Sequence, residues 1–379
     1  MIHYITKKID NDYIVWFEQS NRWVQFKEPA WLVNKLYQKG VDNVVISFKI
    51  AQKYNLLPQE SSRFVNEICS GIAELSKQTT NTRIELNYTY FPSGYSFVPY
   101  SIRYYFIRNK CIAIIYETRL AEYYIHPSLA HLETKYSEIV DVQYEIYNHD
   151  NISVLMEKDR PETACNFDDF IRLKKRLFIF ITNYIYNKTD NDWMSFVHAS
   201  ALTDGKQTIL LSSASGSGKS TMSALLQTKG LQFVSDDFVP IDIKSKLVFP
   251  FPAAISIKEG AFDFLSPYYG NLREKSFNKY EYTNKSIRYI TPKVSGFDYY
   301  KAKPVKSILF IRYNQHVACN FNQVPTNEAL KLFHEQAWVS GIPEHAKAFI
   351  NWFVKLRCFN LEYGNSEQGI SKILNLFDK

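Results

Sequence analysis

One stretch of the sequence restricts the fold more than any other, because an apolar run, a run of small residues and a helix-forming run follow one another directly. The stretch reads TILLSSASGSGKSTMSALLQTKG over residues 208–230. The apolar residues predict a buried strand, the small residues a tight loop, and the remainder a helix that ends at Gly230. Residues 231–242 predict another strand. The order strand, loop, helix, strand favours a helix that crosses over a sheet.

The small residues of this loop match a phosphate-binding pattern. In the P-loop or Walker A pattern, G-x-x-x-x-G-K-[ST], backbone N–H groups and the positive end of the following helix bind phosphate. Lys219 is expected to reach the β- and γ-phosphates of ATP, and Ser220 to offer its hydroxyl to Mg²⁺. Ser213 stands where the pattern has its first glycine. The residues expected to bind the nucleotide are Ser215, Gly216, Ser217, Gly218, Lys219, Ser220 and Thr221.

Two carboxylates end the strand that follows the predicted helix, in the run FVSDD over residues 233–237. A carboxylate at a strand end beside a P-loop holds Mg²⁺, and a second one can accept a proton from an attacking hydroxyl. Asp236 and Asp237 are therefore candidates for these two roles. His198, in the run FVHASAL before the loop strand, is a third candidate. A structural role for this histidine is the alternative.

The order of these motifs resembles the C-terminal kinase domain of HPr kinase/phosphorylase and of proteins related to it. The resemblance is carried by Trp193, His198, the run 216–221, the aspartate pair, and the run FPAAISIKEGAF over 251–262. It extends over roughly residues 167–379. The resemblance implies a P-loop kinase fold, ATP and Mg²⁺ as cofactors, and a serine hydroxyl as phosphate acceptor.

The resemblance also implies roles for single residues. Asp236 would be the catalytic base, His198 would tune Asp236, and Lys219 would act on the phosphates. Ser220 and Asp237 would hold the metal ion. An exchange of roles between the two aspartates stays open.

Two further features bear on the resemblance: three basic residues after the loop, and the absence of one motif. Lys258, Lys285 and Arg288 are candidates to stabilise the transferred phosphoryl group, and exposed surface charge is the alternative. No E-x-R-G-like run follows the aspartate pair. Its absence argues against the reverse, dephosphorylating activity and against assuming HPr itself as the acceptor.

The patterns outside the loop region predict further segments. Residues 1–80 predict two short strands and three helices, a winged-helix-like module. Its runs WFEQSNRWVQF (16–26), IAQKY (50–54) and FVNEICSGIAEL (64–75) are similar to PqqD-like peptide-binding domains. Residues 81–165 alternate with a period of two and predict a β-rich segment, in which the run RIELNYTYF (83–91) is one strand. Residues 166–379 form the predicted kinase domain, with a long helix over 167–187. The fold class expected is therefore a multidomain α+β and α/β protein.

Composition restricts the partners that the protein can have and the cell compartment in which it is expected. The net charge of +7 is spread along 379 residues, so a nucleic-acid partner is not expected. The five cysteines are scattered without a CxxC pair, which argues against a disulfide framework or a zinc site. No apolar segment is long enough to suggest a membrane span, and the first residues lack a signal-peptide pattern. A cytoplasmic protein is expected, and a homo-oligomer by analogy with the relatives.

Together these features predict a kinase that transfers the γ-phosphate of ATP to a hydroxyl, with a serine of a peptide or protein as acceptor. A precursor of a ribosomally made, modified peptide fits the predicted N-terminal module. Two alternatives stay open. One is a nucleotide-gated regulator that captures a peptide, and the other is a kinase of a small molecule such as free serine.

Overall fold

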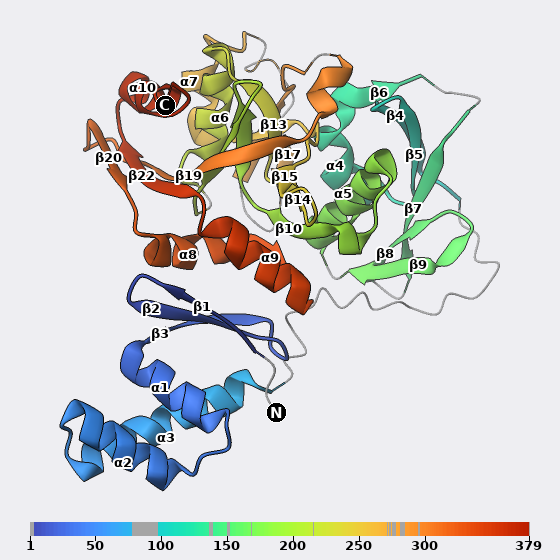
Figure 1. Cartoon of the computed structure of the whole chain (residues 1–379). Coiled ribbons are helices and arrows are strands. Elements are labelled where there is room, and N and C mark those ends of the chain that lie inside the picture. The colour runs from blue at the N-terminus through green and yellow to red at the C-terminus, as the bar shows by residue number, and fades with distance from the viewer. Residues whose placement is uncertain are drawn as a thin grey trace. The chain divides into compact units, whose positions relative to one another are not determined.

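The computed structural model of the protein describes most of the chain. The described residues are 4–77, 98–135, 139–149, 152–167, 169–214, 216–270, 272, 274, 278–280, 285–294 and 296–378. The chain forms two compact units, shown with all elements in Figure 1. Unit 1 combines Met1–Glu85 with Val324–Leu356, and unit 2 combines Leu86–Gln323 with Arg357–Lys379. Residues 324–356, which the sequence analysis places in the kinase domain, are therefore grouped with the N-terminal elements.

Unit 1 contains a three-stranded antiparallel sheet and a group of helices. Its elements are β1 (Tyr4–Ile9), β2 (Asp12–Phe17), β3 (Arg22–Lys27), α1 (Glu28–Tyr37), α2 (Asn43–Tyr54), α3 (Pro58–Leu75), α8 (Thr326–His334), β21 (Ala337–Val339) and α9 (Pro343–Phe353). The strand order is β1-β2-β3. The three predicted helices are present, but the sheet has a third strand that the sequence analysis missed. Asn21, with a φ of 50°, belongs to the turn between β2 and β3, where asparagine tolerates the left-handed conformation.

Two kinds of contact join residues 324–356 to the sheet of unit 1. The ring of Phe349 in α9 lies 5.8 Å from that of Trp23 in β3, measured between centroids. The Lys7 ammonium donates a hydrogen bond to Asn351 Oδ1 at 3.0 Å. The Asn327 side chain donates to the buried carboxylate of Asp12 at 2.7 Å. These distant residues complete the core and the polar contacts of unit 1.

The first part of unit 2 is the β-rich segment that the alternating sequence predicts. Its sheet has the order β6-β4-β5-β7-β8-β9. The strands are β4 (Ser101–Ile107), β5 (Lys110–Tyr116), β6 (Glu133–Thr134), β7 (Val142–His149), β8 (Ile152–Glu157) and β9 (Arg160–Phe167). β5 and β7 pair in parallel, and α4 (Arg119–Ile125) lies between them in the chain. The strand predicted over 83–91 lies outside the described residues.

The long helix predicted over 167–187 is α5 (Phe170–Tyr186), which begins where the Asp169 side chain accepts a hydrogen bond from the Arg172 amide. α5 packs on α4, β8 and β9. The ring of Phe178, in the middle of α5, also contacts Phe238 and Phe251, at centroid distances of 5.7 and 4.6 Å. None of the described helices is both long and apolar enough to cross a membrane.

The second part of unit 2 contains a larger sheet and the glycine-rich loop. The strands are β10 (Trp193–Val197), β11 (Ser200–Thr203), β12 (Thr208–Ser212), β13 (Gln232–Asp236), β14 (Val239–Asp242), β15 (Leu247–Val248), β19 (Lys303–Tyr313), β20 (Cys319–Gln323) and β22 (Arg357–Tyr363). Part of the strand order is β13-β11-β12-β19-β15-β14-β10, and β22 pairs with both β19 and β20. The helices of this part are α6 (Lys219–Thr228), α7 (Phe262–Leu265) and α10 (Ser366–Leu374).

A small three-stranded sheet and short 3₁₀ helices complete unit 2. The sheet has the order β16-β18-β17, formed by Ile255–Lys258, Lys285–Ile290 and Asn278–Tyr280. The 3₁₀ helices cover His126–Ser128, Ala130–Leu132, Asp190–Asp192, Glu259–Ala261 and Phe297–Tyr300.

The predicted order strand, loop, helix, strand is present as β12, the loop, α6 and β13. β12 and β13 are not neighbours, however, because β11 lies between them and pairs antiparallel with both. β12 and β13 consequently run in the same direction. The apolar face of α6 is buried against this sheet through Met222, Leu225 and Leu226.

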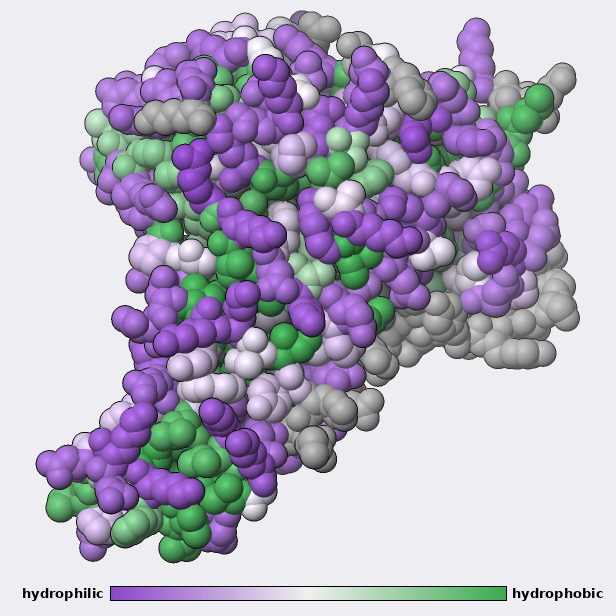
Figure 2. Space-filling model, viewed as in Figure 1, coloured by the Kyte–Doolittle hydropathy of each residue, from purple (hydrophilic) through white to green (hydrophobic). Residues whose placement is uncertain are grey.

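Figure 2 shows where apolar side chains reach the surface. On unit 1, green apolar residues gather on the helical part of the unit. The exposed ones include Val44 and Phe48 of α2, whose side chains are 77% and 69% exposed, and Leu57, at 66%. Val44 and Phe48 are four residues apart and therefore lie on one helix face.

Candidate active site

The glycine-rich loop of residues 213–218 connects β12 to α6. Gly216 and Gly218 have φ angles of 90° and 92°, in the left-handed region that favours glycine. Gly218 is also closely surrounded, because a Cβ atom there would lie 3.0 Å from Tyr363 Oη and 3.3 Å from Tyr313 Cβ. Ser215 lies outside the described residues. The two glycines allow the chain to turn sharply into the helix.

The start of α6 leaves backbone N–H groups facing the loop. The first amide of the helix with a backbone acceptor in the described chain is that of Met222, which donates to the Gly218 carbonyl oxygen at 2.9 Å. The amides of the preceding helical residues, which include Ser220 and Thr221, have no partner within the helix, as at every helix start. The loop is held in place by β19, since the Tyr313 amide donates to the Ser217 carbonyl oxygen at 3.0 Å.

Ser213, which replaces the first glycine of the pattern, opens this loop. Its side chain is buried, and its hydroxyl has no hydrogen-bond partner in the part of the chain that the structure describes. Buried hydroxyl groups in folded proteins normally have a partner. An unsatisfied hydroxyl beside a helix N-terminus is compatible with a site that takes up a polar ligand.

Asp236 is the last residue of β13 and is almost completely buried, with 3% of its surface exposed. Its Oδ2 accepts a hydrogen bond from the Ser220 hydroxyl at 3.0 Å, and its Oδ1 accepts one from the Ser200 hydroxyl. Ser200 stands directly opposite Asp236 in the β11–β13 pair, which explains the second contact. Asp236 therefore faces the first turn of α6.

Asp237 follows in a left-handed conformation, with a φ of 60°. Its Oδ1 accepts a hydrogen bond from the Lys219 ammonium at 2.5 Å, and its Oδ2 accepts one from the Ser256 hydroxyl at 3.2 Å. The Asp237 side chain is 42% exposed, in contrast to that of Asp236. The two adjacent acids thus have different partners and different access to solvent.

His198 lies beside Asp237 because the chain passes from one strand pair to another at both positions. β10 pairs with β14 and β11 pairs with β13, so the chain crosses from one pair to the other at residues 198–199 and again at 237–238. A tight turn, in which the Ala199 amide donates to the Val197 carbonyl oxygen at 3.0 Å, surrounds His198. His198 Nε2 consequently lies 3.7 Å from Asp237 Oδ1.

Burial and neighbouring charges shift the pKa values of these groups in different directions. Burial and the charge of Asp237 raise the pKa of Asp236 above its usual value. Burial also opposes ionisation of Asp237, but the ammonium of Lys219 overcomes this effect and holds the pKa of Asp237 below its usual value. Burial, assisted by the positive charge of Lys219, lowers the pKa of His198 to about 4. The histidine is thus neutral at pH 7.

The three cations that were candidates to stabilise the phosphoryl group have different surroundings in the structure. Lys258, in β16, lowers the pKa of His198 through its charge and therefore lies near the site. The Arg288 guanidinium lies over the ring of Phe262, 4.2 Å from its centroid. Lys285 is the first residue of β18, and its side chain lies outside the described part.

The sequence analysis missed other residues near the acids. Ser200 and Ser256 donate hydrogen bonds to the two carboxylates. Both lie inside runs already used for prediction, FVHASAL and FPAAISIKEGAF, but neither was a candidate. Lys174 and Lys175 of α5 also act on this site: Lys174 interacts electrostatically with Asp237, and the charge of Lys175 lowers the pKa of His198. The signal available in the sequence was the run of basic residues at the start of α5.

The oxygen atoms at the start of α6 suit Mg²⁺. The Ser220 hydroxyl and the Asp236 carboxylate lie 3.0 Å apart and are hard oxygen donors of the kind that Mg²⁺ prefers. In the described ranges, no three His, Cys, Asp or Glu side chains gather as a metal site. This donor set fits Mg²⁺, which usually takes one or two carboxylates and completes its shell with water and phosphate oxygens.

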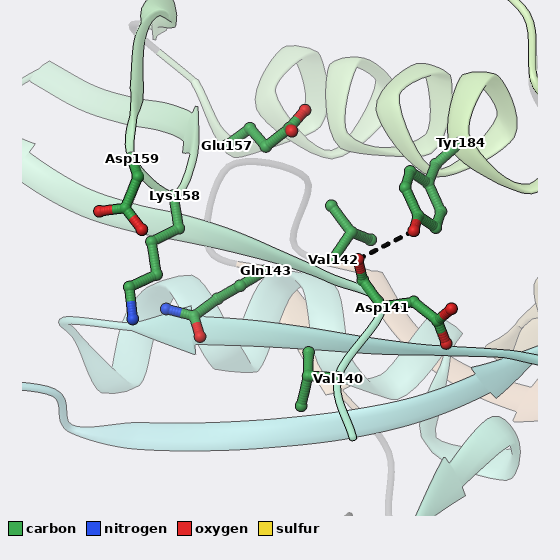
Figure 3. A pocket seen from close by; sticks show the side chains of 8 residues that line it. All are labelled: Val140, Asp141, Val142, Gln143, Glu157, Lys158, Asp159 and Tyr184. Carbon is green, nitrogen blue, oxygen red and sulfur yellow. Dashed lines mark hydrogen bonds between the residues drawn. The ribbon is translucent and has the colours of Figure 1, made fainter. Parts of the chain in front are cut away.

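A separate hollow of about 320 Å³ lies over β7, β8 and the end of α5 (Figure 3). Polar side chains of both charges line it, among them Asp141, Glu157 and Lys158. The Tyr184 hydroxyl donates to the Asp141 carbonyl oxygen at 2.8 Å, as the dashed line in Figure 3 shows. None of the residues of the candidate active site lines this hollow.

A comparison with models of known protein families found no match for this chain, and a comparison with curated proteins found none either.

Proposed function

We propose that the protein is an ATP-dependent kinase that transfers the γ-phosphate to a serine hydroxyl of a peptide or protein. One observation carries the proposal: Lys219 and Ser220, at the start of α6, each contact one of two adjacent carboxylates. A lysine, a hydroxyl and two acids at the end of a glycine-rich loop are the groups that phosphoryl transfer requires. The surrounding cations near His198 support the same reaction class.

The nucleotide phosphates bind at the loop and at the first turn of α6. The amides of Ser220 and Thr221 have no acceptor within the helix, and the positive end of the helix favours an anion there. Ser215 belongs to the same loop and completes the proposed set. Lys219 leaves Asp237 and moves onto the phosphate oxygens, because a triphosphate offers it a larger negative charge.

Ser220 and Asp236 are the residues that would hold Mg²⁺. The ion, when bound, neutralises charge on the phosphate oxygens. This assignment exchanges the roles that the resemblance implies for the two aspartates. The reason is geometric, since Asp236 contacts Ser220 whereas Asp237 contacts Lys219.

Asp237 is then the catalytic base. Its side chain is partly exposed, so an acceptor hydroxyl can reach it, whereas the carboxylate of Asp236 is buried. Asp237 accepts the proton of the serine hydroxyl, the serine oxygen forms a bond to the γ-phosphorus, and the bond from phosphorus to the β–γ bridging oxygen breaks. ADP leaves with that oxygen. His198, 3.7 Å from Asp237, positions the carboxylate.

Unit 1 is proposed to bind the acceptor peptide. Its sheet has β1 and β3 at the two ends of the strand order, and a free strand edge can add an extended peptide by main-chain hydrogen bonds. The proposed reaction takes place in the cytoplasm.

Incubation of the purified protein with γ-labelled ATP, Mg²⁺ and a cell extract tests the proposal. A labelled peptide or protein is the expected product, and the Lys219→Ala and Asp237→Asn variants should form none while they keep the fold. Labelled free serine would instead identify a small-molecule kinase. ATP-dependent peptide binding without any labelled product would indicate a nucleotide-gated regulator and would overturn the proposal.

A further inference from the structure

Two adjacent lysines of α5, Lys174 and Lys175, interact electrostatically with residues of the candidate active site. Lys174 lies one helical turn before Phe178 on the same helix face. The Phe178 ring contacts Phe238, the residue after Asp237, so this face of α5 packs beside the turn that holds Asp237. Lys174 is half-buried and interacts with the charge of Asp237, and the neighbouring Lys175 is exposed.

Among the described residues, no carboxylate forms an ion pair with Lys174 or Lys175. Asp237, the acid that interacts with the charge of Lys174, forms its ion pair with Lys219. Burial lowers the pKa of Lys174. A half-buried ammonium without a partner costs free energy. Such a cation beside a catalytic base favours an anion that comes from outside the chain.

The elements that carry the cations indicate which substrate brings this anion. Lys219 comes from α6, which packs on β11, β12, β13 and β16 and carries the proposed triphosphate site at its start. Lys174 comes from α5, which packs on α4, β8 and β9. The two lysines thus approach Asp237 from different elements, and only Lys219 belongs to the phosphate loop. The anion at Lys174 therefore belongs to the substrate that brings the hydroxyl.

Resting on the proposed function, we propose that the acceptor carries a carboxylate close to its serine hydroxyl, and that Lys174 and Lys175 bind this carboxylate. Two sources supply the same chemistry. One is an acidic side chain next to the serine, and the other is the terminal carboxylate of a peptide that ends in serine. In both cases the carboxylate places the hydroxyl beside Asp237.

Four synthetic peptides of equal length test this proposal. Two have amidated ends and differ in the residue after serine, Asp in one and Asn in the other. Two end in serine, one with a free carboxylate and one with an amide. The readouts are KM and kcat with γ-labelled ATP, and fluorescence anisotropy of the labelled peptides on the full-length protein. We expect about tenfold lower KM and Kd for a peptide with a carboxylate than for its neutral partner.

The variants separate recognition from catalysis. Lys174→Met and Lys175→Met should each reduce the preference for the carboxylate and leave the KM for ATP unchanged, and Lys174→Arg should retain part of it. Lys206→Met, an exposed lysine in the β11–β12 turn, is the matched control and should change nothing.

Each outcome decides one question. Equal KM and Kd values for the members of each pair would overturn the carboxylate proposal and leave the kinase intact. A larger effect of Lys174→Met on the KM for ATP than on the KM for the peptide would also overturn it, because Lys174 would then bind the nucleotide. Tighter binding of the carboxylate peptides through Lys174, without any phosphate transfer, would support recognition and contradict the kinase.

Discussion

At the residue scale, the candidate site depends on two adjacent aspartates that the fold treats differently. Asp236 ends a strand and is buried against Ser220, whereas Asp237 adopts a left-handed conformation and points to Lys219 and His198. Their pKa values shift in opposite directions for this reason. The same residue type in consecutive positions therefore offers two chemical groups, and substitutions should separate them.

Replacement of Asp236 by asparagine and replacement of Asp237 by asparagine should change the stability of the ligand-free protein in opposite directions. The raised pKa of Asp236 means that the folded protein holds this proton more tightly, so stability falls as pH rises from the unfolded pKa through the folded one. Asp236→Asn should therefore be more stable than wild type at pH 8. The lowered pKa of Asp237 contributes stability that is lost as pH falls, so Asp237→Asn should be less stable at pH 8.

Urea unfolding between pH 4 and pH 8, in the presence of a chelator, measures both differences. The difference for Asp236→Asn should shrink as the pH falls toward 4, whereas the difference for Asp237→Asn should stay constant, because the stability that Asp237 contributes is lost only below the usual carboxyl pKa. A common sign for both variants at pH 8 would contradict the assigned shifts.

Gly218 should be required for nucleotide binding because of its surroundings as well as its conformation. Alanine at position 218 is strained by the positive φ and also approaches Tyr363 Oη, at 3.0 Å. Gly230→Ala is a matched control, since its φ is 98° but nothing lies within 4 Å of the added carbon. Both variants should lose about 1 kcal/mol of unfolding free energy. Calorimetric titration with ATP should show lost binding only for Gly218→Ala, and equal loss in both would assign the effect to backbone strain.

The sequence was sufficient to identify these residues as candidates but not to predict their contacts. Lys219, Ser220, Asp236, Asp237 and His198 were all candidates from their motifs, and the structure brings them together. Which acid meets the lysine depends on where the strand pairs change partners. That crossing involves backbone pairing between segments about forty residues apart, for which local sequence carries no signal.

At the element scale, α5 connects the β-rich sheet to the candidate site. The sequence predicted this helix over 167–187, and the structure has it begin slightly later, at Phe170, after the Asp169 cap. The insertion of β11 between β12 and β13 was not predicted, because strand order within a sheet depends on distant pairing. The third strand of unit 1 was missed for a different reason. The turn at Asn21 lies inside one continuous run of aromatic and polar residues.

Phe178 should transmit the packing of α5 to the turn that holds Asp237. Its ring is 5% exposed and contacts Phe238, which follows Asp237. Phe178→Ala should lower the unfolding free energy by about 3 kcal/mol and reduce kcat, because Phe238 loses the ring that fixes it. Ile171→Ala, at an exposed position of the same helix, should change stability by less than about 0.5 kcal/mol. Denaturant unfolding and initial rates measure both effects, and an unchanged kcat in Phe178→Ala would argue against the coupling.

At the scale of the whole molecule, unit 1 is built from two segments that are far apart in the chain. Residues 324–356 complete this unit, although they follow the glycine-rich loop by more than a hundred positions in the sequence. Periodicity identifies each helix but does not tell which distant sheet it covers. Domain boundaries drawn from the sequence alone therefore placed these residues with their chain neighbours.

A fragment of residues 1–85 should be less stable than the same fragment linked to residues 324–356. The shorter fragment lacks Phe349, which contacts Trp23, and Asn327, which bonds the buried carboxylate of Asp12. A buried carboxylate that loses a donor and an aromatic ring that loses its cover both lower stability. Thermal unfolding followed by circular dichroism compares the two fragments, and equal midpoints would show that residues 324–356 are dispensable for unit 1.

The ion pair between Lys219 and Asp237 has a kinetic consequence. The Lys219 ammonium cannot pair with Asp237, the proposed base, and bind a triphosphate at the same time. Before ATP binds, the proposed proton acceptor is paired with Lys219, so a peptide that binds early would meet a carboxylate that cannot take its proton. Turnover should therefore follow a compulsory order, nucleotide first and acceptor second, and product-inhibition patterns should reveal ADP as the last species to depart.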